Sequence, residues 1–503
     1  MKEDRREFLK KSGCALGMVA LSTQMRHFGM MSAMAQSYQD ENAVPSDYRA
    51  LVCIFMSGGN DSNNLVIPNH NDATISNYTA YSNARAAQGL AIPQANLLPI
   101  AVPRLSNLTY GLHPSLGPQT INGTTIVNTG IHDLWNTGAG LGRLAVVTNV
   151  GTLVAPTLKA QMSQSTHPKP YQLFSHSDQV SQFQGGRSDQ QSFTGWGGRV
   201  SDLRTSPDNP GGLLPMITSI SGAQLFTAGQ TTLPLAVAAA PTGLNNVLNP
   251  QGYNTTTESQ ARLSAFNTLR TQDLSSQVIA AASTVTNQAM LANANLQTFQ
   301  EVTVTFPNSN LGNQLKQVAR LIKKRTDLSV NRQIFYVQIG GFDTHNNQTA
   351  ANGQTGLLTT LSQAMRAFYE EMVVQGLQDK VTQFTMSDFN RTFNPASSGA
   401  AVGSDHAWGG HHLVVGGGIT GSDFYGSLRP DGSGNYYPTL TFNGPDDSDS
   451  GTGARGRWIP TSSVEQYAAT LARWYGLPDA SLPTVFPKIT NFPNTNLGFM
   501  GPA

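Results

Sequence analysis

Four short runs rich in apolar, β-branched and aromatic residues stand out along the 503-residue chain. They cover residues 51–56, 144–150, 334–339 and 381–386, and each is followed by glycine or serine. Apolar runs of this length are typical of β-strands that are buried on both faces, as strands of a parallel sheet usually are. The pattern therefore predicts strands of one central sheet.

Apolar residues at helical spacing come before and between the last two of these strands. The order helix, strand, helix, strand over residues 311–388 is typical of a parallel sheet with helical crossovers. Because such crossovers are right-handed, we expect both strands in one sheet, with the residues that follow them at the same edge. Residues 464–475 predict a further, terminal helix. The apolar positions at helical spacing are Leu315, Val318, Ala319, Ile322, Leu358, Leu361, Met365, Phe368 and Met372.

Two segments depart from this pattern. Residues 201–310 are rich in Ser, Thr, Gln, Asn and Ala, and helical periodicity begins only near 257, so we interpret the segment as an insertion or cap. Residues 430–458 are rich in Gly, Asp and Ser and predict a loop. The hydrophobic share of 39 % in 503 residues is enough for one large core. We therefore expect a single α/β domain over residues 36–503.

The first 35 residues have the pattern of a targeting segment. Arg5 and Arg6 stand before a weakly apolar stretch, in a pattern that resembles the twin-arginine export signal, and residues 33–35 suit cleavage after Ala35. We expect export by the twin-arginine translocase and a periplasmic or secreted protein. No other segment is long and apolar enough to predict a stable membrane span.

Charge and cysteine content narrow the classes of function. The predicted cleavage leaves 25 basic against 27 acidic residues, so nothing indicates a nucleic-acid partner. Cys53 is the only cysteine left, and we expect it to be a small core residue. Gly451–Gly456 fits the dinucleotide-binding pattern G-x-G-x-x-G, but it follows an acidic segment instead of a strand, so this binding is not expected.

Candidate chemistry lies where the predicted strands end. Asp61, Asp343 and Asp388 each follow such a strand within a short motif. Strand carboxyl ends line one edge of a parallel sheet, where ligands bind, so we expect the three acids to converge. Close acids repel each other, and a bound cation would relieve that repulsion. His345 and His406 complete the predicted metal site.

The residue types leave the role of single residues and the identity of the metal open. Alone, Asp61 would more often be a capping residue, and a structural role is the better expectation for His411 and His412. Imidazole and carboxylate ligands together suit zinc, whereas all-oxygen surroundings suit Mg, Mn or Ca. Zinc is the expected divalent metal.

Several motifs together resemble a known family. The chain is similar to the bacterial exported family catalogued as domain of unknown function 1501, which in turn is similar to the alkaline phosphatase and sulfatase superfamily. The resemblance implies a three-layer α/β/α fold, a mostly parallel sheet, an α-rich insertion and a two-metal site at the strand ends. The motifs are LVCIFMSGGNDSNNLVIP, GLHPSL, LFSHSDQ, GGFDTH, SDFNRT, GSDHAWGGHH and YAATLARWYG.

The resemblance also implies roles for individual residues. Asp61 matches the metal aspartate after the first strand, and Asp343 with His345 resembles the Asp/His pair of one metal site. Asp388 matches the acid of the other site, although the superfamily typically has a histidine where Phe389 stands. His406 resembles the last metal histidine. The nucleophile of the superfamily falls near Ser175, and the position of Cys53 inside a strand disfavours a modified-cysteine mechanism.

These roles predict an exported metal-dependent hydrolase of phosphate or sulfate esters, either small molecules or polymers. Ser175 would attack in line, and Arg391 would neutralise the developing oxyanion. Thr166 or a water molecule is the next candidate nucleophile. The alternative is a non-catalytic exported binding or assembly factor on a degenerate alkaline-phosphatase-like scaffold.

Overall fold

A computed structural model provides the fold. It describes residues 47–121, 123–136, 142–232, 234–247, 253–272, 274–275 and 277–502. The predicted signal segment, residues 1–35, lies outside the described residues.

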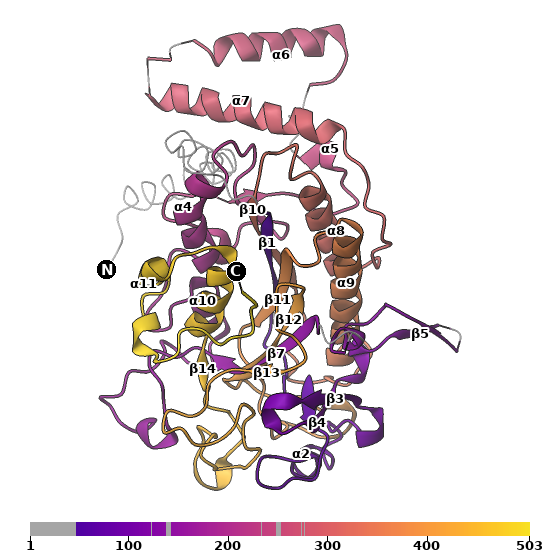
Figure 1. The fold of residues 1–503 in the computed structure, drawn as a ribbon, viewed down its shortest axis with the longest axis vertical. Coiled ribbons are helices and arrows are strands. Elements are labelled where there is room, and N and C mark those ends of the chain that lie inside the picture. Colours follow the sequence, from indigo (N-terminus) through magenta and orange to yellow (C-terminus); the bar gives the residue numbers. More distant parts are fainter. Residues whose placement is uncertain are drawn as a thin grey trace, which may run out of the picture.

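A nine-stranded sheet forms the centre of the part of the chain that the structure describes (Figure 1). The strand order is β13-β7-β12-β11-β1-β10-β8-β9, and β14 pairs with β7. All pairings are parallel except those that β12 makes with β11 and β7. The strands are β1 (Arg49–Met56), β7 (Leu144–Gly151), β8 (Ile217–Ser219), β9 (Leu235–Ala236), β10 (Arg332–Ile339), β11 (Val381–Ser387), β12 (Gly410–Gly416), β13 (Phe424–Tyr425) and β14 (Ser462–Ser463).

Helices cover both faces of this sheet, so the predicted three-layer α/β/α arrangement with a mostly parallel sheet is confirmed. Along β1, Val52 and Ile54 point into the core that α8 and α9 cover, whereas Leu51 and Cys53 point into the core that α4 and α10 cover. This alternation follows from the two-residue period of a strand. The helices are α2 (Tyr78–Arg85), α3 (His176–Gly185), α4 (Trp196–Asp208), α5 (Leu244–Val247), α6 (Thr257–Leu269), α7 (Gln277–Gln297), α8 (Asn310–Lys323), α9 (Gln354–Val374), α10 (Val464–Tyr475) and α11 (Leu482–Val485).

The segment expected to be an insertion has two structural parts. Within residues 201–310, β8 and β9 extend the central sheet, whereas α6 and α7 lie beyond its end as a pair (Figure 1). Two smaller sheets stand apart from the central one. They are built from β2 (Val66–Pro68), β3 (Leu98–Val102) and β4 (Leu108–Leu112), and from β5 (Gln119–Ile121) and β6 (Thr124–Ile126).

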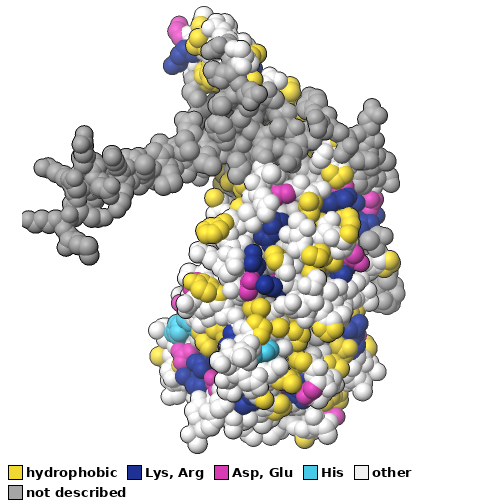
Figure 2. All heavy atoms as spheres, turned by 90° about the vertical axis from the view of Figure 1, so that its left-hand side faces the viewer, with side chains coloured by type: hydrophobic (Ala, Val, Ile, Leu, Met, Phe, Trp, Pro, Cys, Tyr) yellow, Lys and Arg dark blue, Asp and Glu magenta, His cyan; other side chains and the backbone are white. Residues whose placement is uncertain are grey.

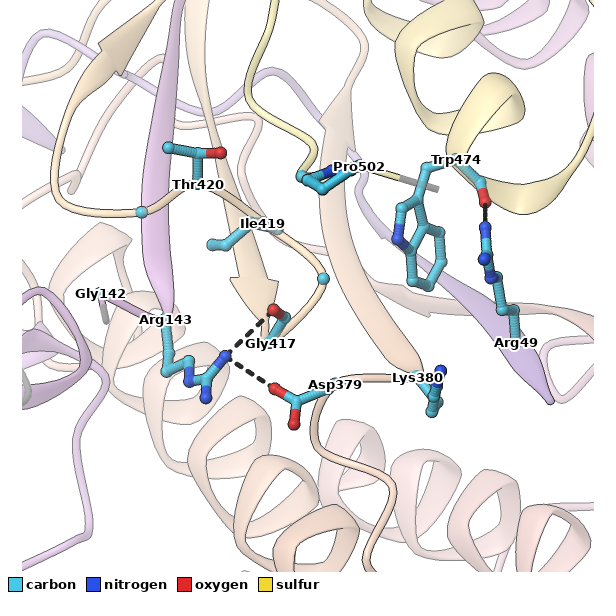
Figure 3. A pocket seen from close by; sticks show the side chains of 13 residues that line it. Arg49, Gly142, Arg143, Asp379, Lys380, Gly417, Ile419, Thr420, Trp474 and Pro502 are labelled. Atoms are coloured by element: carbon cyan, nitrogen blue, oxygen red, sulfur yellow. Dashed lines mark hydrogen bonds and ion pairs between the residues drawn. The ribbon is translucent and has the colours of Figure 1, made fainter. Parts of the chain in front are cut away.

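The two edges of the central sheet differ in character. β11, β1 and β10 are neighbours, so their carboxyl ends deliver Asp388, Asp61 and Asp343 to the same edge, as predicted. A cavity of about 490 Å³ lies at the opposite end of the strands, where β1 and β11 begin (Figure 3). There Arg143 forms an ion pair of 2.8 Å with Asp379. The predicted metal site is therefore separated from this cavity by the length of the strands.

The surface carries both signs of charge. On the face that Figure 2 shows, basic and acidic side chains are interspersed among uncharged polar groups, as the similar counts of 31 basic and 30 acidic residues lead one to expect. In the described part of the chain, no helix combines the length and the apolar character that a membrane span requires.

One buried acid makes stability depend on pH. Glu465, at the start of α10, is 0 % exposed. Its Oε2 accepts the backbone N–H of Lys488 at 2.9 Å, and its Oε1 has no hydrogen-bond partner among the described residues. Burial raises the pKa of Glu465 from 4.5 to about 8. The folded state therefore keeps a proton that the unfolded state releases between these pH values, and stability falls as pH rises through the window.

We expect Glu465→Gln to remove this dependence. The variant should be more stable than the wild type by about 4 kcal/mol above pH 8 and nearly equal to it at pH 4.5. Urea unfolding at both pH values measures the difference, with exposed Glu258→Gln as the control. Parallel stability profiles of the wild type and Glu465→Gln would contradict a raised pKa.

Candidate metal centre

Three histidines and one aspartate gather at the carboxyl edge of the sheet. His176, Asp343, His345 and His406 each offer a ligand atom, and the four atoms lie within 4.8 Å of one another. The Nε2 atoms of His345 and His406 are 2.9 Å apart, and Oδ1 of Asp343 lies 3.2 Å from the first of them. The same oxygen lies 3.4 Å from Nε2 of His176. This group could hold a metal ion.

Distant segments build the cluster. His176 is the first residue of α3, Asp343 and His345 lie in the loop after β10, and His406 lies in the connection from β11 to β12. Close backbone packing holds these loops together. A Cβ on Gly58, which has φ of +115°, would lie 2.3 Å from the amide nitrogen of Asp343, so only glycine fits there.

The second nitrogen of each imidazole is held by an acceptor outside the cluster. Nδ1 of His176 lies 2.7 Å from Asp388, and Nδ1 of His345 lies 3.0 Å from Asp405. Nδ1 of His406 lies 2.8 Å from the carbonyl oxygen of Phe174. Because carboxylate and carbonyl oxygens accept hydrogen bonds, each Nδ1 carries the hydrogen in the neutral ring and each Nε2 presents a lone pair to the cluster. Such outer acceptors are typical of metal-binding histidines.

Electrostatics differ among the ligands. The bond to Asp388 raises the pKa of His176, although burial opposes the shift. Burial lowers the pKa of His406, so this ring stays neutral more readily. Burial alone would raise the pKa of Asp343, but the hydrogen bond and charge of Arg391, together with the charges of His176 and His345, outweigh it, and the pKa is lowered overall. A neutral imidazole and an ionised carboxylate are the protonation states that a metal requires.

Asp388 lies behind the cluster. Its side chain is 2 % exposed, and its two oxygens accept from the Gly58 backbone N–H and from His176. The carboxylate therefore orients a ligand histidine and is not one of the four grouped ligands in this structure.

Asp61, also predicted as a ligand, lies in a separate buried network. It forms an ion pair with Arg85, and both side chains are 0 % exposed. Gln348 donates to the same carboxylate at 2.6 Å and Asn63 donates at 3.0 Å. With these protein donors on both oxygens, the structure gives Asp61 a structural ion pair outside the four-residue cluster.

Arg391 supplies positive charge among the three predicted acids. Its pKa is lowered by burial, against the opposing effects of Asp343, Asp61 and Asp388. The guanidinium is 0 % exposed, pairs with Asp343 and donates to backbone carbonyls, including that of Ser404 at 3.0 Å. In this conformation Arg391 orients Asp343 and does not reach solvent.

Ser175 directly precedes a ligand of the cluster. It occupies the N-cap position of α3, and its hydroxyl donates to the carboxylate of Asp178. Phe174, just before it, has φ of +68°, a strained value that the contact of its carbonyl with His406 helps to hold. Phe389 packs against the rings of His176 and His406 at centroid distances of 4.7 and 4.6 Å.

Sequence reasoning places three of the grouped ligands, Asp343, His345 and His406, and does not select His176. The motif LFSHSDQ contains His176, but the resemblance assigns the nucleophile to Ser175 beside it. A histidine directly beside a candidate nucleophile is the signal that could have found it. His411 and His412 are buried in β12, as their expected structural role requires.

The donor set fits a transition metal of the zinc type. Three imidazole nitrogens and one carboxylate oxygen match the ligands and the coordination number of zinc sites. Two Nε2 lone pairs 2.9 Å apart repel each other unless a cation or a proton lies between them. Nε2 of His176 is buried and has no hydrogen-bond partner in the described part of the chain.

Comparison with known proteins identifies the family. The chain belongs to the family described as "Protein of unknown function (DUF1501)", whose model matches residues 48–437. No curated protein matches the chain. Among solved structures, it is similar to the PsFucS1 sulfatase from Pseudoalteromonas sp., at 8 % identity and a TM-score of 0.28, over 95 % of this chain and 74 % of that one. A TM-score this low carries no inference about the site.

Replacing Asp388 by Asn should weaken metal binding by about 10–100-fold, the usual cost of losing an outer carboxylate. The amide has no charge with which to favour the Nδ1–H of His176. Competition with a chromophoric zinc chelator measures the affinity. Asp423→Asn is the control, because Asp423 pairs with Arg104 outside the cluster. Equal affinities for Asp388→Asn and the wild type would show that Asp388 does not support a ligand.

Proposed function

We propose that this protein is an exported hydrolase of phosphate or sulfate esters that uses one metal ion, zinc in the first instance. The ion would be held by His176, Asp343, His345 and His406. The proposal rests on one observation, the convergence of these four ligand atoms with every Nδ1 held from outside.

Zinc in such a site supplies a Lewis acid that polarises an ester oxygen and favours attack by a nearby nucleophile. Ser175 is the proposed nucleophile because it directly precedes the ligand His176. Asp178 accepts the hydrogen bond of the Ser175 hydroxyl and is therefore placed to accept its proton. Thr166 and a water molecule are the alternatives.

Arg391 enters the proposal as a positioning residue. Its buried guanidinium holds Asp343 and the loop after β1, so it would act through a metal ligand instead of on the substrate. It also balances acids that would otherwise need a second cation. We therefore propose one metal per chain, in place of the two that the family resemblance implied.

Export remains part of the proposal. The pattern in residues 1–35 supports passage through the twin-arginine translocase, cleavage after Ala35 and a periplasmic or secreted location. Because that translocase carries folded proteins, the metal could be bound before export.

One observation favours the alternative, a non-catalytic binding or assembly factor on the same scaffold. Asp61 and Asp388, which the resemblance implied as ligands, are occupied by Arg85 and His176. A reduced ligand set of this kind is what a degenerate site would contain.

The experiment that separates the two functions is a turnover assay of the zinc-loaded mature protein against a panel of phosphate and sulfate esters. The hydrolase proposal predicts turnover of at least one ester, and Ser175→Ala should abolish it while metal content stays unchanged. Ser163→Ala is the control, because Ser163 is an exposed serine whose hydroxyl donates to the carbonyl of Ala160.

Two other outcomes have defined meanings. Full turnover by Ser175→Ala would move the nucleophile to Thr166 or to water. A fully metallated protein that turns over no ester on the panel would favour the binding factor.

A further inference from the structure

The cavity of about 490 Å³ lies at the end of the strands opposite the metal centre, and the proposed function does not use it (Figure 3). Segments far apart in the sequence line it: the start of β1, residues 142–143 and 379–380, the chain after β12, the end of α10 and residues 501–502. The volume is within the range of small-molecule sites in proteins. The side chains of the lining therefore decide which class of ligand fits.

Basic side chains dominate the charged part of the lining. Arg49, Arg143 and Lys380 line the cavity, and Asp379 is the single acid among the described lining residues. Arg143 pairs with Asp379 at 2.8 Å, which leaves the other two basic groups to find a counter-charge outside the lining. The wall of the cavity is therefore positively charged.

One acid outside the lining serves both of these groups. Asp47 pairs with Arg49 at 2.8 Å and lies 3.9 Å from the Nζ atom of Lys380. The same side chain also pairs with Arg332 at 3.2 Å. One negative charge cannot neutralise three positive charges, so an excess of positive charge remains beside the cavity. An anion bound in the cavity would reduce that excess.

Several donor atoms on the wall lack hydrogen-bond partners. Arg143 uses Nη1 both for the carbonyl of Gly417 at 3.0 Å and for Asp379, and its Nε and Nη2 have no hydrogen-bond partner among the described residues. In the same part of the chain, Nζ of Lys380 and Nε1 of Trp474 also have none, and the indole N–H faces the cavity (Figure 3). Because all of these atoms donate, a complementary ligand must accept hydrogen bonds.

The chain after β12 comes close to two of these donors. A Cβ on Gly417 would lie 2.6 Å from Nη1 of Arg143, and a Cβ on Gly418 would lie 2.6 Å from Cζ2 of Trp474. Glycine at both positions lets the backbone pack directly against these side chains. Because the side chain of Arg143 is 15 % exposed and Trp474 is 4 % exposed, packing holds both donors in place before a ligand binds.

We propose that this cavity binds a small organic anion, whose phosphate or carboxylate group accepts hydrogen bonds from Arg143, Lys380 and Trp474. Arginine and lysine are the usual partners of such groups. Ile419 and Pro502 also line the cavity, so an apolar part of the ligand has a surface to contact. The excess of positive charge disfavours a metal cation. The inference does not depend on the proposed hydrolase activity.

Titration calorimetry of the metal-free mature protein with phenyl phosphate and with benzoate tests the site. The metal is removed so that neither probe binds to zinc. We expect at least one probe to bind with a Kd of about 1 mM or below, and to bind more weakly as ionic strength rises. Benzyl alcohol has a similar ring without the charge and should not bind. Absence of binding by both anions, or equal binding of benzyl alcohol, would overturn the proposal.

Variants assign the binding to this cavity. Arg143→Gln should weaken binding of the probe about tenfold, because it removes a charged donor. Lys380→Gln changes a side chain that is 45 % exposed, so it should fold normally and weaken binding about two- to fivefold. Arg187→Gln is the matched control, because Arg187 pairs with Asp189 outside the lining, and it should bind like the wild type. Unchanged affinity in both lining variants, or affinity that is lost in His406→Ala instead, would place the anion elsewhere.

Discussion

His406→Ala should reduce the affinity of the protein for zinc by more than about 100-fold, beyond the effect expected for an outer-shell carboxylate. Nε2 of His406 lies 2.9 Å from Nε2 of His345, and its loss leaves one of four ligand positions open. Substitution should cost little in folding, because His406 is only partly buried and packs at the edge of the site. Equilibrium competition with a zinc chelator measures the change.

A matched variant gives this result its meaning. His132→Ala removes a histidine that bonds the carbonyl of Pro99, far from the cluster in the sequence and outside its ligand group. It should retain the affinity of the wild type. If His406→Ala also retained that affinity, the four-residue cluster would not be the metal site.

Asp61→Asn should reduce the free energy of unfolding by about 3–5 kcal/mol and leave the zinc affinity of the folded protein nearly unchanged. Asp61 and Arg85 form a fully buried ion pair, so removal of the carboxylate charge leaves a guanidinium that is buried without a counter-charge. Urea unfolding of the metal-free protein separates the stability effect from metal binding.

Exposed Asp72 provides the control for this prediction. Its carboxylate accepts hydrogen bonds from Thr74 in the same turn, so Asp72→Asn should change stability by less than about 1 kcal/mol. The opposite result for Asp61→Asn, normal stability with much weaker zinc binding, would return Asp61 to the ligand role that the sequence predicted.

The central sheet was predictable because burial on both faces leaves a clear mark on the sequence. β1 appears as a continuous apolar run, and β10 and β11 as runs of apolar, β-branched and aromatic residues with few interruptions. The crossover rule places their carboxyl ends together. The short strands β8 and β9, of three and two residues, leave no such mark inside a polar segment. Their place in the sheet depends on tertiary contacts.

The site was predictable only in part. Strand ends indicate where Asp61, Asp343 and Asp388 arrive, but not which positive groups meet them. Arg85 reaches Asp61 from α2, and Arg391 reaches Asp343 from a different loop, so two acids are balanced by side chains that no local pattern connects to them. From the sequence, we expect a bound metal ion to supply the positive charge that balances these acids.

Sequence reasoning misses His176 for a related reason. His176 lies in the first turn of α3, which comes after β7 and a long loop. The other three ligands lie in the loops that follow β10 and β11. Only the folded chain brings His176 within 3.4 Å of Asp343 and 2.7 Å of Asp388. No rule of sequence spacing predicts that a histidine at the start of a helix will meet an acid at the end of a strand.

X-ray absorption of the mature protein loaded with zinc tests the central claim most directly. We expect one tightly bound zinc per chain, with four nitrogen or oxygen ligands at about 2.0–2.2 Å and the outer-shell scattering of three imidazoles. Two tightly bound metals per chain, or a shell made of oxygen without imidazole, would contradict a single centre built from His176, Asp343, His345 and His406.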